Sequence, residues 1–168
     1  DGIGYYTSIA VNGPGKAYIS YFDWYNEDLK YATNAAGSWT RTTVDSSGSV
    51  GYYTSLALDG SGNAHISYYD DTNSDLKYAT NAGGLWATEA VDSGGFADMS
   101  SLAFDESGAM HVAYVNNGIV YATNASGSWV TRTLDSEGYF YTPSLGVDGS
   151  GNVHISYQYM NSNRNTRS

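Results

Sequence analysis

The chain of 168 residues is acidic, with a formal net charge of −10, and it contains 17 Tyr, 20 Gly, 2 Pro and no Cys. This length corresponds to one domain, and the lack of cysteine excludes disulfides and thiolate metal sites. Nucleic acids and anionic membranes bind clustered Lys and Arg, so the 7 scattered basic residues exclude both as expected partners. No apolar run approaches the roughly 18 residues that a membrane-spanning helix requires.

Four similar segments follow one another along the chain. They read SIAVNGPGKAYISY from Ser8, SLALDGSGNAHISY from Ser55, SLAFDESGAMHVAY from Ser101 and SLGVDGSGNVHISY from Ser144, at intervals of 47, 46 and 43 residues. Periods of this length are typical of solenoids, propellers and arrays, in which each repeat is one structural unit. The last interval is shorter because one polar loop of the third repeat is trimmed.

Each repeat predicts a meander of four short antiparallel strands. In the second repeat, runs rich in Tyr, Leu, Ile and Val alternate with turns such as GSGN and NAGG, which favour tight hairpins. The predicted strands of this repeat are 53–59, 64–69, 75–80 and 85–91. Helical periodicity is nowhere sustained, so we expect essentially no helix.

The segments SLALDGSGNAHISYYD (55–70) and LKYA (76–79) resemble a bacterial β-propeller repeat of secreted and surface proteins, written S-L-A-L-D-x-x-G-x-x-H-I-S-Y-Y-D followed by L-K-Y-A. The resemblance covers nearly the whole chain. It implies an all-β propeller of four-stranded antiparallel blades in an extracellular or cell-surface protein. The S-x-D-x-G-x-x-W order of the sialidase Asp-box is absent, so no sialidase site is implied.

The repeats define a single domain over 1–168 that holds about 3.5 blades. The predicted blades are 5–44, 53–91, 100–134 and a half blade at 141–159. Propellers typically have four to eight blades, and an open stack exposes an apolar face and unpaired strand edges at its ends. We therefore expect another chain to complete the ring, most simply in a homodimer with about seven blades; the alternative is that the chain is a fragment of a longer propeller.

Several repeated residues are better explained by packing than by chemistry. His65, His111 and His154 occupy one repeat position, and we interpret them as buried and hydrogen-bonded within each blade, with no metal or cofactor. The turn at 59–63 has a weak likeness to a calcium loop, but a carboxylate that stabilises the hairpin turn explains it better. Trp39, Trp86 and Trp129 are expected to wedge between neighbouring blades.

The candidate binding surface is the face that carries the loops between second and third strands together with the joints between blades. Aromatic rings beside Asp and Asn suit neutral sugars, because rings stack on sugar faces and carboxylates accept hydrogen bonds from hydroxyls. The candidate ligand-binding residues are Asp23, Trp24, Tyr25, Asp70 and Asp71. Aromatic residues at the joints are Tyr5, Tyr6, Tyr52, Tyr53, Phe96, Tyr139 and Phe140, and packing between blades is their alternative role.

These patterns favour a non-enzymatic recognition or assembly module that binds a glycan or a protein. The first alternative is a self-assembling interaction scaffold with no small-molecule site. The second is a propeller polysaccharide lyase or hydrolase, although the sequence has no G-x-S-x-G motif, no Ser-His-Asp order and no basic cluster that would form a subsite.

Overall fold

In the computed structural model, which describes residues 3–160, fourteen antiparallel strands form three four-stranded sheets and one two-stranded sheet. The first sheet contains β1 (Ile3–Val11), β2 (Ala17–Asp23), β3 (Asp28–Thr33) and β4 (Thr40–Asp45). The second contains β5 (Val50–Leu58), β6 (Ala64–Asp70), β7 (Asp75–Thr80) and β8 (Ala87–Asp92). The third contains β9 (Asp98–Phe104), β10 (Met110–Val115), β11 (Ile119–Thr123) and β12 (Val130–Asp135). The fourth contains β13 (Tyr139–Val147) and β14 (Val153–Met160).

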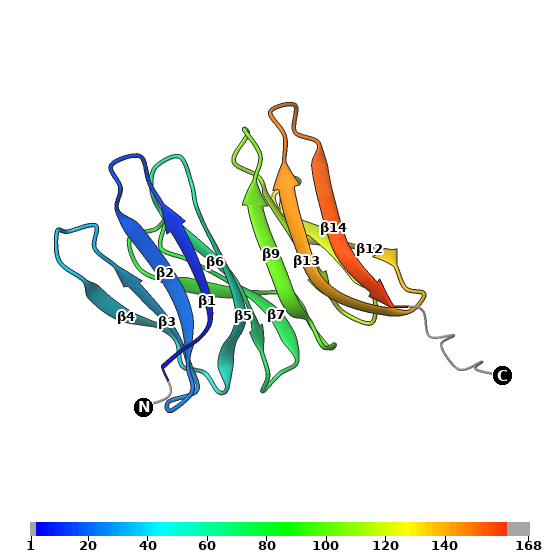
Figure 1. The fold of residues 1–168 in the computed structure, drawn as a ribbon, viewed down its shortest axis with the longest axis horizontal. Helices are drawn as coiled ribbons and strands as arrows, with labels where there is room; N and C mark the ends of the chain where they lie inside the picture. Colours follow the sequence, from blue (N-terminus) through cyan, green and yellow to red (C-terminus); the bar gives the residue numbers. More distant parts are fainter. Residues whose placement is uncertain (1–2, 161–168) are drawn as a thin grey trace.

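The four sheets are the blades of a β-propeller. Each is a meander whose strands are hydrogen-bonded in chain order, and the sheets stand one after another along the molecule, each beginning with its innermost strand (Figure 1). The prediction of an all-β propeller with about 3.5 blades is confirmed, and the described residues contain no helix. The strands begin two or three residues before the predicted blade limits and end one residue after them, while residues 161–168 of the predicted domain lie outside the described range.

The innermost strands β1, β5, β9 and β13 converge on a hollow of about 260 Å³. Two equivalent residues from each of these strands line it, namely Tyr6 and Thr7, Tyr53 and Thr54, Met99 and Ser100, and Thr142 and Pro143. The first residue of every pair has a positive φ of 46–51°, which is rare outside glycine and marks a bulge. The bulge turns the Tyr6 carbonyl toward the next sheet, where Thr54 Oγ1 donates a hydrogen bond to it at 2.8 Å.

The hydrophobic core lies between the sheets. Leu29 of the first sheet packs with Leu56 and Ile66 of the second, and Leu76 of the second packs with Val112 of the third. Alternate strand positions face one neighbouring sheet or the other, so both faces of a central sheet must be apolar, as the burial of every residue of β6 shows.

A serine hydroxyl links each innermost strand to the next one. The backbone N–H groups of Leu56, Leu102 and Leu145 donate hydrogen bonds to Ser8 Oγ, Ser55 Oγ and Ser101 Oγ, each at 3.0 Å. These N–H groups lie on the edge of their sheet, where no strand of the same sheet can accept from them. The serine that recurs at the start of each segment therefore forms a hydrogen bond that joins neighbouring sheets.

The predicted packing of the repeated Trp residues is confirmed where a preceding sheet exists. The Trp86 ring meets Tyr31 of the first sheet edge to face, with ring centroids 5.0 Å apart, and Trp129 meets Tyr78 of the second sheet at 5.6 Å. Trp39 belongs to the first sheet, which has no preceding sheet within residues 3–160, and 55% of it is exposed.

The predicted burial of the repeated His residues is confirmed for two of the three. His65 and His111 are buried, and their rings bond to Tyr78 and to Tyr121, respectively. The prediction is wrong for His154, whose side chain is 69% exposed. The fourth sheet has two strands in the described range, so the strand that carries the tyrosine partner in the other sheets is not beside this ring.

Candidate functional site

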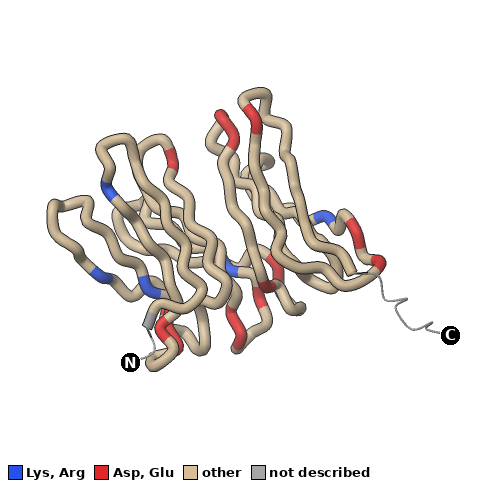
Figure 2. Tube along the Cα trace, in the orientation of Figure 1, with Lys and Arg blue, Asp and Glu red and all other residues tan. Residues whose placement is uncertain are grey.

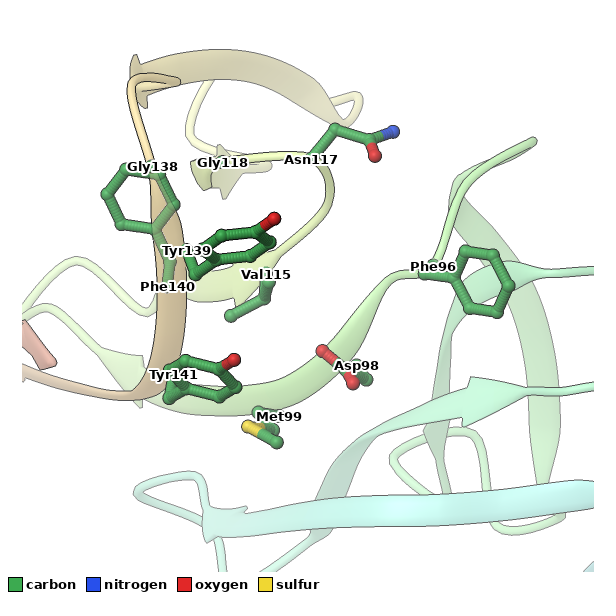
Figure 3. A pocket seen from close by; sticks show the side chains of 10 residues that line it. All are labelled: Phe96, Asp98, Met99, Val115, Asn117, Gly118, Gly138, Tyr139, Phe140 and Tyr141. Carbon is green, nitrogen blue, oxygen red and sulfur yellow. The ribbon is translucent and has the colours of Figure 1, made fainter. Parts of the chain in front are cut away.

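A pocket of about 390 Å³ lies at the junction of the third and fourth sheets, on the face that carries the β10–β11 loop and the joint before β13. Tyr139 and Tyr141 extend from one wall toward Asp98 on β9, while Phe96 lies in the joint before β9 with its ring directed away from the two tyrosines (Figure 3). The lining residues are Phe96, Asp98, Met99, Val115, Asn117, Gly118, Gly138, Tyr139, Phe140 and Tyr141. The loop face proposed from sequence is thus where the pocket opens.

The pocket exists because the third sheet lacks two aromatic rings that the first two sheets have. One cross-strand position carries the pairs Tyr5–Phe22, Tyr52–Tyr69 and Asp98–Val115 in the three sheets. Phe22 and Tyr69 are almost fully buried, and the Phe22 ring packs against Tyr52 at a centroid distance of 4.2 Å. Replacement of two aromatic rings by Asp98 and Val115 removes that volume and leaves the pocket.

The loop beside the pocket is also shorter than its counterpart in the second sheet. Asn116, Asn117 and Gly118 connect β10 to β11, and Asn117 has a φ of 50° while Gly118 has one of 158°. A Cβ on Gly118 would lie 2.3 Å from the Asp135 carbonyl oxygen, so only glycine allows this close approach of the loop to β12. The side chain of Asn117 is exposed at the mouth of the pocket.

Asp98 is the polar centre of the site. Among residues 3–160 no Lys, Arg or His forms an ion pair with it, and burial raises the pKa of its carboxyl group above the ordinary aspartate value. A carboxylate without a cationic partner keeps its oxygens free to accept hydrogen bonds from a ligand. Phe96 and Tyr139, which also line the pocket, are 71% and 60% exposed and are therefore accessible aromatic rings at its edge.

Two predicted site residues of the first sheet do form an exposed aromatic surface. Trp24 and Tyr25 are 57% and 86% exposed, and Tyr5 lies beside Trp24 with ring centroids 5.8 Å apart. Asp23 is 5% exposed and accepts hydrogen bonds from Tyr25 N at 3.1 Å and Asn26 Nδ2 at 2.8 Å. Asp23 therefore braces its loop, while ligand binding by Trp24 and Tyr25 stays a prediction.

The predicted residues of the second sheet follow the same pattern. Asp70 is fully buried and accepts hydrogen bonds from Asn73 N and Asn73 Nδ2 at 3.0 and 2.9 Å, with Lys77 Nζ at 3.5 Å. Asp71 is exposed at the tip of that loop. The five predicted residues thus lie on two neighbouring loops, away from the pocket at the third and fourth sheets, whose lining includes none of them.

Sequence reasoning named Phe96, Tyr139 and Phe140 as joint aromatics but missed Asp98 and Asn117. The signal for Asp98 was the repeat itself, since the other three segments have Tyr at this position. Phe140 fulfils the packing alternative, because it is 5% exposed and its ring lies 5.7 Å from that of Tyr157. Phe96 and Tyr139 do not pack in this way and remain accessible.

The charge of the described chain is predominantly acidic, which disfavours anionic ligands. Acidic residues mark the loops at both ends of the sheets, with few basic residues among them (Figure 2). Within residues 3–160 no three His, Cys, Asp or Glu side chains come together as a metal site. In the turn that has a likeness to a calcium loop, the Asp59 carboxylate accepts bonds from Ser61 N, Asn63 N and Asn63 Nδ2 at 2.7–2.9 Å, which are the bonds of a stabilised turn.

The fold is similar to solved structures of carbohydrate-binding and carbohydrate-active proteins. A fucose lectin from Kordia zhangzhouensis in complex with methyl-fucoside matches with a TM-score of 0.55 and 17% identity, over 77% of this chain and 99% of the lectin. A protein of unknown function from Dyadobacter fermentans matches with a TM-score of 0.69 and 12% identity, over 92% of this chain and 49% of its own. An engineered GH43 glycoside hydrolase with endo-xylanase and exo-arabinofuranosidase activity matches with a TM-score of 0.61 and 11% identity, over 91% of this chain and 40% of its own.

These similarities define the class of protein, a β-propeller whose fold is shared with lectins and glycoside hydrolases. No protein-family model and no curated protein matches the sequence. The chain spans the whole of the lectin but half or less of the other two structures. Among residues 3–160 there is no helix with the length and hydropathy to cross a membrane.

Proposed function

We propose that this propeller is a carbohydrate-recognition module that binds a neutral sugar in the pocket between the third and fourth sheets. The observation that carries the proposal is the Asp98 carboxylate, which has no ion-pair partner within residues 3–160 and lines the pocket together with the accessible rings of Phe96 and Tyr139. The rings would stack on the apolar face of a sugar while Asp98 accepts hydrogen bonds from its hydroxyls. The similarity of the fold to a fucose lectin supports this class of ligand.

Binding without hydrolysis is the better supported activity. Most glycoside hydrolases place two carboxyl groups about 5–10 Å apart on either side of the scissile bond. The pocket lining contains one carboxylate, Asp98. We accordingly propose a non-enzymatic module, in an extracellular or cell-surface setting as the repeat resemblance implies, with a ring completed by another copy of the chain.

The test is a glycan array probed with the labelled protein, followed by calorimetry with the best ligand and with methyl-fucoside. Asp98→Asn and Tyr139→Ala are expected to weaken binding at least tenfold, because they remove the acceptor and one stacking surface. Trp24→Ala is the matched control, since it deletes an equally exposed ring from the first sheet. A protein that binds no glycan would exclude the proposal, and loss of binding in Trp24→Ala alone would move the site to the first sheet.

A further inference from the structure

The junction between consecutive sheets has one design throughout the chain. The innermost strand of the following sheet packs on the first two strands of the preceding sheet, so β5 contacts β1 and β2, β9 contacts β5 and β6, and β13 contacts β9 and β10. The fourth sheet consists of two strands in the described range, and these are the two that a following innermost strand would contact.

The exposed side of this fourth sheet, here termed the tail flank, presents Ser144 on β13 with His154 and Ser156 on β14. All three residues are exposed, and they line a shallow hollow of about 580 Å³. The positions equivalent to Ser156 in the first and second sheets, Ser20 and Ser67, are fully buried by the sheet that follows them. The tail flank is thus a junction surface with no following sheet on it within residues 3–160.

The opposite end of the stack, here termed the head flank, presents Thr7, Ile9 and Val11 of β1. Ile9 and Val11 are 63% and 61% exposed. Their counterparts in the next sheet are Leu56, which is 7% exposed, and Leu58, which packs in the core between the first two sheets. The head flank therefore carries the apolar side chains of an innermost strand that no preceding sheet covers within residues 3–160.

The polar groups of the two flanks match as they do inside the chain. Each internal junction has a serine Oγ that accepts from the N–H of the following strand, and the corresponding unused groups are Ser144 Oγ on the tail flank and Ile9 N on the head flank. The same hydrogen bond, from a backbone N–H to a serine Oγ, occurs at all three internal junctions. The tail flank and the head flank have the groups to form a fourth bond of this kind.

A second hydrogen bond, between two side-chain hydroxyls, joins the sheets at the first two junctions. Ser20 bonds Thr54 at 2.8 Å, and Ser67 bonds Ser100 at 2.8 Å. The third junction has no such pair, because Ala113 and Pro143 occupy the two positions. The third junction therefore lacks both hydroxyls. At the equivalent positions of the two flanks, Ser156 of the tail flank and Thr7 of the head flank both have a hydroxyl, and both residues are exposed.

The third contact of the junction is between a ring and the following strand. The His65 ring meets Phe104 of the next sheet edge to face, with ring centroids 4.8 Å apart. His154 is the equivalent of His65, and Val11 is the equivalent of Phe104. Within residues 3–160 neither residue has a neighbouring sheet on its flank, and His154 also lacks the third strand that covers the equivalent ring in the other sheets.

We propose that the head flank of a second copy of this chain docks on the tail flank of the first, with Ser144 Oγ accepting from Ile9 N and Ser156 Oγ paired with Thr7 Oγ1. The inference specifies the contact by which the proposed ring is completed, and it does not depend on the sugar pocket. Two copies in this arrangement supply eight blade positions, of which two are half blades, within the range of four to eight that is typical of propellers.

Disulfide trapping tests this register directly, since the chain has no cysteine of its own. Thr7→Cys and Ser156→Cys are made as separate single variants, mixed, oxidised and examined by non-reducing gel and peptide mass spectrometry. We expect a Thr7–Ser156 disulfide between copies as the main product, because their Cβ atoms would be as close as those of Ser20 and Thr54. Ser20→Cys combined with Thr54→Cys in one chain is the positive control. A mixture that stays monomeric, or that yields symmetric Thr7–Thr7 links equally well, would overturn the proposal.

Light scattering on unmodified protein gives an independent test. At micromolar concentration we expect twice the 18.0 kDa of one chain, and Ile9→Asp should reduce the mass to that of one chain because a carboxylate would be buried unpaired. Leu85→Asp is the matched control, since Leu85 is 84% exposed in a turn away from both flanks. A monomeric wild type would contradict the docking. The sugar site is tested separately, because Asp98→Asn should lose glycan binding while its mass remains that of the wild type.

Discussion

The hydroxyl of Tyr68 on β6 donates a hydrogen bond of 2.7 Å to the Asp45 carboxylate at the end of β4, in the preceding sheet. Both residues are buried, and Lys77 of the second sheet bonds the same carboxylate oxygen. The same relationship recurs between Tyr114 and Asp92 at 2.7 Å and between Tyr157 and Asp135 at 3.1 Å. An outer strand of each sheet is thereby fastened to the second strand of the next sheet.

Tyr68→Phe should destabilise the fold by about 2 kcal/mol, which is typical of a buried hydrogen bond to a charged group. Urea denaturation followed by fluorescence would measure the change. Tyr157→Phe is the control, because its bond to Asp135 is exposed and its loss should change the unfolding free energy by less than about 0.5 kcal/mol. Equal losses in both variants would show that burial of the bond is not what matters.

Gly51→Ala should be among the most damaging substitutions of a small residue. Gly51 has a φ of 108°, and an added Cβ would lie 2.8 Å from the Leu29 Cα atom, so both backbone strain and a clash arise. We expect a loss of at least about 2 kcal/mol in unfolding free energy. Gly60→Ala, at an exposed turn with nothing within 4 Å of the added atom, should be nearly neutral in the same denaturation assay.

Acid should weaken the second sheet through the turn at Asp59. Burial favours the neutral acid there, but hydrogen bonds from Asn63, His65 and Ser61 outweigh it and hold the pKa of Asp59 at about 2. A pKa lower in the folded than in the unfolded chain contributes stability that is present above about pH 4 and is lost as the pH falls toward 2. Denaturation midpoints of Asp59→Asn should therefore depend less on pH between 4 and 2 than those of the wild type, while Asp71→Asn, with its exposed side chain, should retain the wild-type slope.

Sugar binding should weaken on acidification at a higher pH than an ordinary aspartate would predict. Burial raises the pKa of Asp98, and the protonated acid is a poorer acceptor of hydrogen bonds from hydroxyls. Calorimetric titrations from pH 7 down to pH 4 should show a falling affinity. The residual affinity of Asp98→Asn should stay constant over this range, and a parallel decrease in that variant would assign the effect to another group.

The repeat made most of the fold predictable, because four copies of one pattern average out local ambiguity. Turns of Gly, Ser and Asn follow Asp59 and its equivalents in the sequence, and the structure has a strand on either side of each of these turns. Apolar residues of these strands face the two neighbouring sheets and form the core. The exposure of His154 was not predictable from the pattern, since it depends on a strand pairing that the fourth sheet does not make in the described range.

The candidate site was only partly predictable for two physical reasons. The sequence predicts Asp23 and Asp70 as ligands because they lie in loops beside aromatic residues, but each accepts hydrogen bonds from an Asn three residues later and is buried. The pocket itself results from rings that are missing at Asp98 and Val115. A missing ring is visible in sequence only when the aligned repeats are compared position by position, and its volume is visible only in three dimensions.

The serine that accepts the N–H of the following innermost strand makes successive junctions chemically interchangeable. A unit duplicated in the gene would meet the same hydroxyl before it and offer the same hydroxyl after it, so it could be inserted without redesign of its neighbours. Lengthening or shortening such an array then changes the number of blades, while the bond that holds each addition in place stays the same.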